Sequence, residues 1–283
     1  MPLGNLLNRS QALSYKGVKL VLFLIGMSYA SLVFSQPFDL NSSNSLASDN
    51  LNTAAGPQAE LHIGRVIFGE SMSNGFGRGR GRAWWSIDWP EAEAHITNGV
   101  ERMSLIEVAG DSRHIRLDDP YLYDYPWLFL QQIGQASFSI DEIDALREYL
   151  LRGGFVLIDD FHGPQRQNLV NFATQLFPDR PLIPIPIEDV VMSIHYDLNQ
   201  DTQIPGSRHL RGSNTSGEVV AQMEGEQEWL GIYDDLDNLV LAAHVNMDMG
   251  DAWQHANDPY YPEPMTNLAY RFGVNYFIYA MTH

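Results

Sequence analysis

Two carboxylates and one imidazole follow a short apolar run near the middle of the chain. Asp159, Asp160 and His162 come directly after residues 155–158 (FVLI), a run that is typical of a buried strand. Because neighbouring side chains of an extended chain point in opposite directions, only one of the two aspartates can share a face with His162. Such a group can act as a general acid and base, or it can hold a hard metal ion. A second interpretation is that one aspartate caps the helix predicted from Pro164 while the other is solvated.

A second group of polar side chains follows the strand predicted at residues 239–244. His244, Asn246 and Asp248 alternate along the chain, so they lie on one side if the strand continues. The glycine before Asp251 permits a sharp turn that can bring this carboxylate back to them. An oxygen-rich group with one imidazole suits a hard cation or a polyhydroxylated ligand. The alternative is a loop of Asn and Asp residues whose side chains bond their own backbone.

Four further residues are candidates for contact with a ligand. Arg78, Arg80 and Arg82 alternate with glycine in the segment GRGRGR, so three guanidinium groups can clamp a phosphate or a carboxylate. The same residues also fit a surface loop that neutralises nearby acids. Trp253 follows the second polar group and can stack on a sugar ring, although its size equally suits core packing.

The composition removes several kinds of chemistry. The chain has no cysteine, so thiolate nucleophiles, thiolate metal ligands and disulfides are excluded. Its only lysines are Lys16 and Lys19, so the later part of the chain has no lysine for a Schiff base or a phosphate-binding loop. The common signatures of serine hydrolases, zinc proteases and dinucleotide-binding folds are also absent. We predict no cofactor.

Strand-like and helix-like segments alternate along the chain, and these elements must position the polar groups. Ser139 and Glu142 predict a capping box for a helix between the strands expected at residues 127–130 and 155–158. Such a strand–helix–strand unit implies parallel strands. Asp88 is predicted to cap another helix. The remaining predicted elements are strands at residues 62–68 and 106–108, helices at residues 164–177 and 267–281, and a hairpin formed by residues 229–233 and 239–244.

This alternation predicts an α/β fold, an open sheet with helices on both of its faces. In such sheets ligands bind in the crevice beyond the carboxyl ends of the strands. Both polar groups follow a predicted strand, so both are expected at that edge. Every functional interpretation below depends on the two groups meeting there.

The first 60 residues differ in composition from the rest of the chain. Three cationic residues precede an apolar run at residues 20–34 and a small-residue site at Ser35, so residues 1–35 are predicted to be a signal peptide cleaved near Ser35. The run is short for a membrane-spanning helix, and an uncleaved anchor is the alternative. Residues 36–60 are rich in Asn, Ser and Ala and predict a flexible linker. Residues 61–283 are predicted to form the folded domain.

The charge of the remaining chain limits its partners. The chain has 17 cationic and 35 acidic residues, and removal of the signal peptide takes away three cations and no acid. This leaves 14 arginines against 35 acids, a net charge of −21 that repels nucleic-acid phosphates and anionic lipid surfaces. We therefore expect a periplasmic or otherwise exported protein, with no nucleic-acid partner and no membrane insertion after cleavage.

Several segments of the chain resemble the bacterial family called domain of unknown function 4159. In chain order they are RGRAWWSIDWPEAEAHITNGVERMSLIEV, LDDPYLYDYPWLFLQQIG, FSIDEIDALREYLLRGGFVLIDDFHG, HVNMDMGDAW and AYRFGVNYFIYAMTH. The resemblance implies the flavodoxin-like, mostly parallel sheet of class I glutamine amidotransferase-like domains. It does not imply amidotransferase activity, because that chemistry needs a cysteine. The residues that match the family's recurrent motifs are Asp159, Asp160, Asn246, Asp248, Gly250, Asp251, Trp253, Gly273 and Asn275.

These observations favour a binding function. We predict an exported, non-catalytic module that holds a polar small molecule or a partner protein in the crevice between the two polar groups. The alternative is a carboxylate-dependent or metal-assisted hydrolase that acts on a glycan or another exported polar substrate, with Asp160 and Asp251 as acid and base. A third interpretation is a divalent-metal site in the Asp/Asn loop.

Overall fold

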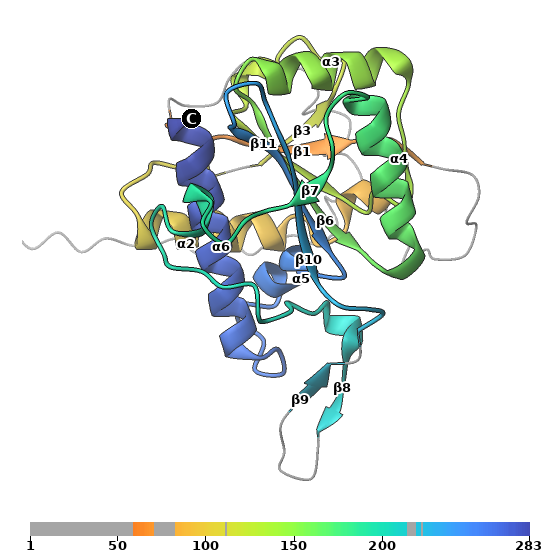
Figure 1. Cartoon of the computed structure of the whole chain (residues 1–283). Helices are drawn as coiled ribbons and strands as arrows, with labels where there is room; N and C mark the ends of the chain where they lie inside the picture. The colour runs from red at the N-terminus through yellow and green to blue at the C-terminus, as the bar shows by residue number, and fades with distance from the viewer. Residues whose placement is uncertain (1–58, 71–82, 111, 214–218, 222) are drawn as a thin grey trace, which may run out of the picture. The chain divides into compact units, whose positions relative to one another are not determined.

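The computed structural model describes residues 59–70, 83–110, 112–213, 219–221 and 223–283. The predicted signal peptide and nearly all of the predicted linker lie outside these residues, as do Arg78, Arg80 and Arg82. Within the described residues, the fold is built on a seven-stranded sheet (Figure 1).

The sheet has a flavodoxin-like strand order. From one edge to the other, its strands are β3 (Arg113–Arg116), β1 (Ile63–Ile67), β4 (Trp127–Gln131), β6 (Phe155–Phe161), β11 (Leu239–Val245), β10 (Glu228–Tyr233) and β7 (Ile183–Pro184). The first five are parallel, and β10 is antiparallel to both of its neighbours. Numbered along the chain, the parallel strands follow the order 2-1-3-4-5, which is the flavodoxin-like order. The predicted open, mostly parallel sheet is confirmed.

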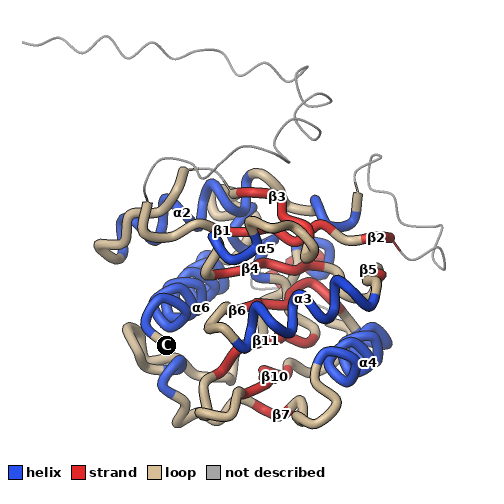
Figure 2. Tube along the Cα trace, turned by 90° about the horizontal axis from the view of Figure 1, so that it is seen from above, coloured by secondary structure: helices blue, strands red, loops and turns tan. Residues whose placement is uncertain are grey.

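Helices cover both faces of this sheet (Figure 2). Successive strand residues point to opposite faces, so Phe129 and Leu157 enter one core while Leu128 and Ile158 enter the other. The first core lies under α2 (Glu91–Met103), α5 (Met249–Gln254) and α6 (Glu263–Thr282), and the second lies under α3 (Ile140–Leu151) and α4 (Arg166–Leu176).

Short elements complete the described part of the fold. Two pairs of short strands lie outside the main sheet, β2 (Gly69–Glu70) with β5 (Ala136–Ser137) and β8 (Leu210–Ser213) with β9 (Val219–Ala221). The 3-10 turns are η2 (Trp84–Ser86), η3 (Leu122–Asp124), η4 (Gly163–Gln165), η5 (Val190–Met192) and η6 (Ser207–His209).

Local signals predict several of these elements well. Ser139 caps α3 by accepting the N–H of Glu142 at its hydroxyl, and the Glu142 carboxylate accepts the N–H of Ser139, which confirms the capping box. β4, α3 and β6 form the predicted parallel unit, and β10 and β11 form the predicted hairpin. The strand expected at residues 106–108 is wrong, because only Val108 makes a bridge, to Leu61. The second strand of the sheet is β3, whose four residues pair with β1.

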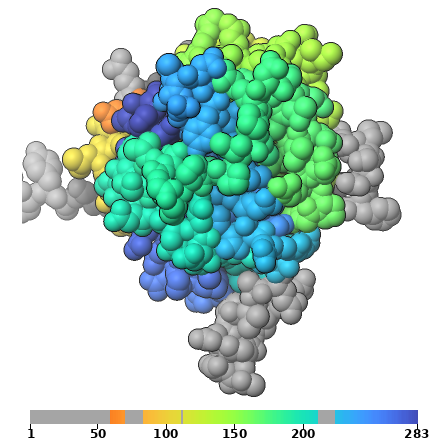
Figure 3. Space-filling view, in the orientation of Figure 1, coloured from red at the N-terminus to blue at the C-terminus, as the bar shows by residue number. Residues whose placement is uncertain are grey.

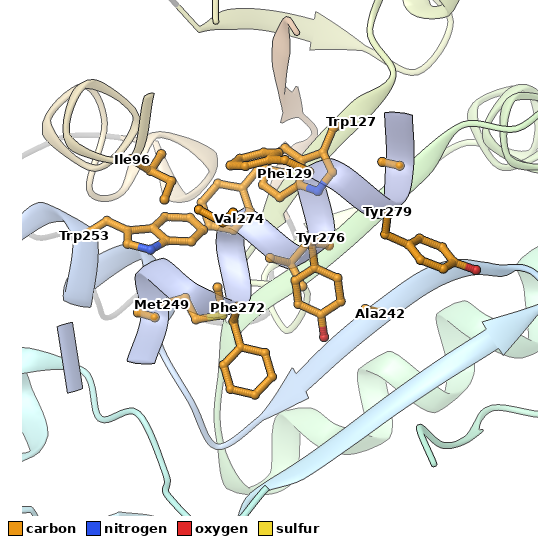
Figure 4. Close-up of a cluster of buried hydrophobic side chains, with 14 of the residues drawn as sticks. Ile96, Trp127, Phe129, Ala242, Met249, Trp253, Phe272, Val274, Tyr276 and Tyr279 are labelled. Carbon is orange, nitrogen blue, oxygen red and sulfur yellow. The ribbon is translucent and has the colours of Figure 1, made fainter. Parts of the chain in front are cut away.

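Large aromatic side chains dominate the core under α6 (Figure 4). Trp127 stacks on Phe129 with ring centroids 5.5 Å apart, and the ring of Trp253 lies 5.4 Å from that of Phe129. Gly273 lets Trp253 approach α6, since a Cβ at this position would lie 3.1 Å from the Trp253 ring. Trp253 is 1% exposed, so it is a core residue and no accessible platform for a sugar.

A long segment between β7 and η6, residues 185–206, lies at the surface and is anchored on α6. Figure 3 shows it in green to teal across the front of the molecule. The anchor is Asn275 of α6, which is fully buried. Its Nδ2 donates to the carbonyls of Val191 and Tyr196, and its Oδ1 accepts the Tyr196 N–H. Asn275 thereby holds the middle of the segment, and the N–H of Asp248, which donates to the carbonyl of Ile204, holds its end just before η6.

Candidate metal centre

The two polar groups meet at the carboxyl ends of β6 and β11. Donor atoms of Asp160, His162 and Asp248 all lie within 4.8 Å of one another. Donor atoms of Asp88, Asp248 and Asp251 form a second group of the same size, so Asp248 belongs to both. We call these five residues the Asp/His cluster. The parallel pairing of β6 with β11 brings its two halves together from positions almost 90 residues apart.

Asp159 and Asp160 have different surroundings. Asp159 anchors the start of α5, where its Oδ2 accepts the N–H groups of Met249 at 2.7 Å and Gly250 at 2.9 Å. Burial raises the pKa of Asp159 to about 8, and repulsion from Asp160 adds to the rise. Asp160 has a φ of +52°, and its Oδ1 lies 3.2 Å from Nε2 of His162. Of the two aspartates, therefore, Asp160 joins His162 in the cluster.

Asp88 is the cluster residue that the sequence prediction assigned elsewhere. We expected it to cap α2, but Pro90 occupies the N-cap position and α2 has no side-chain cap. The Asp88 carbonyl still accepts the N–H of Ala92, while its side chain turns inward from a backbone with φ of +63°. Its Oδ2 accepts a hydrogen bond from Nε2 of Gln131 at 2.7 Å. The residues near Asp88 in the sequence do not distinguish it from an ordinary helix cap, because its hydrogen-bond partner, Gln131, comes from β4.

The end of β4 supplies donors to two cluster carboxylates. Gln131 donates to Asp88, and the next residue, Gln132, donates to Oδ2 of Asp160. Successive residues of a regular strand point to opposite faces, but Gln132 has a φ of +56° and leaves the strand geometry. Both amides therefore reach the same cluster. This pair carries no recognisable motif in the sequence.

Arg65 of β1 is a buried cation behind the cluster. It is fully buried and makes an ion pair with Glu93 of α2. It also donates to Oε1 of Gln131, whose amide group in turn donates to Asp88. Arg65 thus orients Gln131 and, through it, Asp88.

Negative charge is concentrated in the cluster. Burial raises the pKa of Asp88 well above its ordinary value, and repulsion from Asp251 and Asp160 raises it further. Burial also raises the pKa of Asp248, again with repulsion from Asp160 and Asp251. These carboxylates destabilise one another when they are all ionised. A bound cation relieves both the repulsion and the loss of hydration.

The turn η6 covers the cluster from the side of residues 185–206. Ser207 donates its N–H and its hydroxyl to Oδ2 of Asp251, at 2.7 and 2.9 Å. The side chain of Arg208 is half exposed, and its Nη2 lies 3.8 Å from Oδ1 of Asp160. Gly206 permits this approach, since a Cβ there would lie 2.7 Å from Oδ2 of Asp248. Sequence reasoning missed these residues because they belong to an irregular segment.

Two buried imidazoles lie side by side at the cluster. The ring centroids of His162 and His209 are 4.5 Å apart, and both residues are at most 5% exposed. Among the described residues, Nδ1 of His162 and both ring nitrogens of His209 have no hydrogen-bond partner. Burial lowers the pKa of His209, and the nearby His162 and Arg208 lower it further. Buried nitrogen atoms without a partner are unfavourable, so they are candidates to bind a cation or a ligand.

His244 does not join the cluster. It is fully buried on the α6 side of β11, where its Nε2 lies 2.8 Å from the hydroxyl of Tyr276. Burial lowers the pKa of His244 to about 3, so its imidazole is neutral near pH 7. Together with Trp253, it belongs to the core and not to an accessible site.

Asn246 supports the loops around the cluster. β11 ends at Val245 and Asn246 has a φ of +57°, so the expected alternation along the chain stops here. Its Oδ1 accepts the N–H of Gly163 at 2.7 Å, and its Nδ2 donates to the carbonyl of Glu226. These bonds satisfy the Asn246 amide and tie together two loops near the cluster.

The comparison with known families agrees with the family resemblance found in the sequence. Residues 76–281 match the family described as Domain of unknown function (DUF4159). The chain belongs to this family. The DUF4159 match contains every member of the Asp/His cluster, together with the two glutamines of β4 and the turn η6. A search among curated proteins gave no match.

Two properties of this DUF4159 protein bear on the chemistry of the cluster. Carboxylate and imidazole donors suit divalent cations from Mg²⁺ and Ca²⁺ to Mn²⁺ and Zn²⁺. The glutamines, Ser207 and the start of α5 orient the donor groups, as partners around a metal ligand do.

Among the described residues, no helix combines the length and the apolar composition that a bilayer span requires.

Proposed function

We propose that this DUF4159 protein binds divalent cations at the Asp/His cluster and, through them, a polar anionic ligand. The observation that carries the proposal is the convergence of four carboxylates and one imidazole into groups of donor atoms within 4.8 Å. Opposite ligands of a six-coordinate cation lie about 4 to 5 Å apart. The donors are therefore spaced for direct coordination of an ion.

A second observation supports a ligand at this place. An acidic cluster alone is also found where acids serve only as caps. Here, however, His162 is 2% exposed and its Nδ1 has no partner within the described residues. Both ring nitrogens of His209, whose ring lies against that of His162, also lack a hydrogen-bond partner, although Nε2 lies 3.9 Å from a carboxylate oxygen of Glu224. These atoms favour a site completed by something that it binds.

The class of ligand follows from the charges around the cluster. The whole chain carries a net charge of −18 and repels anions at long range. Bound cations and the half-exposed Arg208 create a local positive region beside Asp160. Oxyanions such as phosphate and carboxylate groups fit that region, because guanidinium groups and divalent cations both bind their oxygens.

We propose further that the protein acts outside the cytoplasm. The support is the N-terminal composition, with a cationic start, an apolar run and a small-residue site at Ser35. Sequencing of the N-terminus after expression in a bacterium tests this. A mature chain that begins near Gln36 in the periplasmic fraction is the expected result, and an intact N-terminus in the cytoplasm contradicts it.

Thermal unfolding of the chelator-treated protein tests cation binding. We expect Mn²⁺ to raise the melting temperature of the wild type and to have a much smaller effect on Asp248→Asn, because Asp248 belongs to both donor groups. Asp197→Asn, which changes an exposed acid, is the matched control and should respond as the wild type does. Inorganic phosphate should bind only in the presence of the cation. Equal Mn²⁺ responses in all three proteins would contradict the proposal.

Metal-assisted hydrolysis is a second candidate function, favoured by the adjacent imidazoles of His162 and His209. In that reaction the oxygen of water bonds to the acyl, phosphoryl or anomeric centre, and the bond from this centre to the alcohol oxygen breaks. An imidazole accepts the proton of the water, and the leaving alcohol takes up a proton. Chromogenic phosphate esters, carboxylate esters and glycosides test it in the presence of Mn²⁺. Turnover that falls at least 100-fold in His209→Gln, but not in the exposed-residue control His195→Gln, supports hydrolysis. The absence of turnover leaves binding as the function.

A further inference from the structure

We propose that the Asp/His cluster holds two cations at once, bridged by the carboxylate of Asp248. This inference rests on the proposed function, because it requires that the cluster binds cations. Its basis is the overlap of the two donor groups, in which Asp248 is the shared member. A single ion can use one group and leave the other as a set of buried acids without a counter-charge.

The two groups differ in chemistry. Asp160, His162 and Asp248 provide carboxylate oxygens and an imidazole nitrogen, a set that suits Zn²⁺, Mn²⁺ or Fe²⁺. Asp88, Asp248 and Asp251 provide carboxylate oxygens alone, a set that suits Mg²⁺, Ca²⁺ or Mn²⁺. We name them the mixed site and the oxygen site. Mn²⁺ is acceptable to both and is therefore the best single probe.

The ligand carboxylates share an arrangement that leaves oxygen atoms for a metal. In each, a donor of the protein holds one oxygen, and a cation can take the second. At Asp160 the cation would replace the contact of Oδ1 with Nε2 of His162, which lies 3.2 Å away. Asp248 accepts the N–H of Asp251 through Oδ1, at 2.8 Å. The other held oxygens are Oδ2 of Asp88, Oδ2 of Asp160 and Oδ2 of Asp251, which accept from Gln131, Gln132 and Ser207.

Charge also favours two ions over one. The cluster has four buried or nearly buried carboxylates. The fully buried cation next to them, Arg65, is already paired with Glu93. One divalent ion neutralises two of these charges, and two ions neutralise four. A carboxylate bridge places cations about 3.5 to 4 Å apart, where they can hold one oxyanion between them.

The stoichiometry of Mn²⁺ binding tests the inference. Isothermal titration calorimetry and metal analysis of the desalted protein should give two ions per wild-type chain. Electron paramagnetic resonance should show a spin-coupled pair, because bridged Mn²⁺ ions interact magnetically. Two ions without coupling would contradict the bridge.

Single substitutions test which residue is shared. Asp88→Asn should leave one ion, in the mixed site, and His162→Gln should leave one ion, in the oxygen site. Asp248→Asn should weaken both sites at least 10-fold, since its carboxylate serves both. Asn keeps the capping role at the start of α5, and circular dichroism checks that each variant folds. The exposed controls Asp197→Asn and His195→Gln should bind two ions.

The neighbouring glutamines provide a second, milder comparison. Loss of a partner that orients a metal ligand typically weakens metal binding about 10- to 100-fold. Gln131→Ala should therefore weaken the oxygen site through Asp88, and Gln132→Ala should weaken the mixed site through Asp160. Equal effects of both variants on both sites would argue against two separate positions.

The outcomes separate this inference from the proposed function. Two ions with the expected pattern of variants support both. One ion per wild-type chain overturns the two-cation centre and leaves the proposed function standing. No bound ion overturns both. Two ions of which only one is lost in Asp248→Asn overturn the bridge.

Discussion

Asp248 combines three physical roles in one side chain. It caps α5 through Oδ1, it offers an oxygen to both donor groups, and it suffers repulsion from the acids around it. A cap alone would be served equally well by asparagine, which has no charge to bury. The presence of a buried carboxylate at this position is therefore better explained by binding than by folding.

This distinction leads to a prediction about stability. We expect Asp248→Asn to raise the free energy of unfolding of the chelator-treated protein by about 1–2 kcal/mol, because the cap is kept while a buried, repelled charge is removed. Urea unfolding at pH 7.5 measures the change. A loss of several kcal/mol instead would mean that the carboxylate itself holds the fold together. Asp197→Asn should change the stability by less than about 0.5 kcal/mol.

The buried His244 predicts how the stability of the protein depends on pH. Its folded-state pKa of about 3 lies below the ordinary value of about 6.5, so the unfolded chain takes up the proton first as the pH falls. The stability that His244 contributes is therefore fully present above pH 6.5 and is lost progressively between pH 6.5 and pH 3. From pH 7 to pH 4 this loss amounts to about 3 kcal/mol.

Urea unfolding at pH 7, 5.5 and 4 checks this dependence. In His244→Gln the decrease in stability over this range should be smaller by about 3 kcal/mol than in the wild type. The exposed control His195→Gln should keep the wild-type decrease. Parallel curves for wild type and His244→Gln would show that another group dominates acid unfolding.

At the scale of elements, the Asp/His cluster depends on segments that have no regular structure of their own. η6 brings Ser207 and His209 to the cluster. The preceding segment, residues 185–206, is held in its middle by Asn275 and near its end by the Asp248 N–H, which donates to the carbonyl of Ile204. One buried amide in α6 thus helps to position a turn that is more than 60 residues earlier in the chain.

Removal of this anchor should affect stability more than binding. Asn275→Ala leaves the carbonyls of Val191 and Tyr196 and the Tyr196 N–H without their partner, which we expect to lower the free energy of unfolding by about 2–4 kcal/mol. Mn²⁺ binding should weaken only modestly, because the Asp248 N–H and the Tyr261 hydroxyl still hold the chain just before η6. Chemical unfolding and calorimetry measure the two effects. Asn267→Ala, an exposed position on the same helix, should change neither.

At the scale of the whole molecule, the strand order decides where the site lies. The five parallel strands follow the order 2-1-3-4-5, and the order reverses between β1 and β4. Arg65 comes from β1 and the two glutamines from the end of β4, while Asp160 is the last residue but one of β6 and Asp248 follows β11. The cluster therefore occupies the edge at which open α/β sheets bind their ligands.

Cation binding should then be linked to the stability of the whole domain. A free Mn²⁺ concentration of 100 times the dissociation constant adds about 2.7 kcal/mol per bound ion, which corresponds to about 5–10 °C in melting temperature. Differential scanning calorimetry over a range of Mn²⁺ concentrations measures this shift, and excess chelator should reverse it. A shift of the same size with K⁺ would show a general effect of ionic strength and not a specific site.

Local patterns in the sequence were sufficient to predict many of the helices and strands. The capping box of Ser139 and Glu142, the apolar run of β4 and the turn between β10 and β11 depend on neighbours within a few residues. Such interactions can be read from residue types and spacing. The run at residues 106–108 failed as a strand because pairing with β1 involves a different segment, β3.

The candidate site could be predicted only in part for the same reason. Asp160, His162, Asp248 and Asp251 follow their strands closely, and strand ends are where open α/β sheets bind ligands. Asp88 resembled a helix cap, and the residues of β4 and η6 showed no signal. Their roles arise from contacts between positions 28 or more residues apart.

The sequence by itself determined the family, the α/β class and the edge of the sheet at which polar residues gather. These follow from residue types, short spacings and the direction of parallel strands. Only the tertiary structure decided which of those residues share one cluster, that Asp248 belongs to two donor groups, and that His244 and Trp253 lie in the core. Packing and backbone turns with positive φ set these positions, and both depend on partners that are far away along the chain.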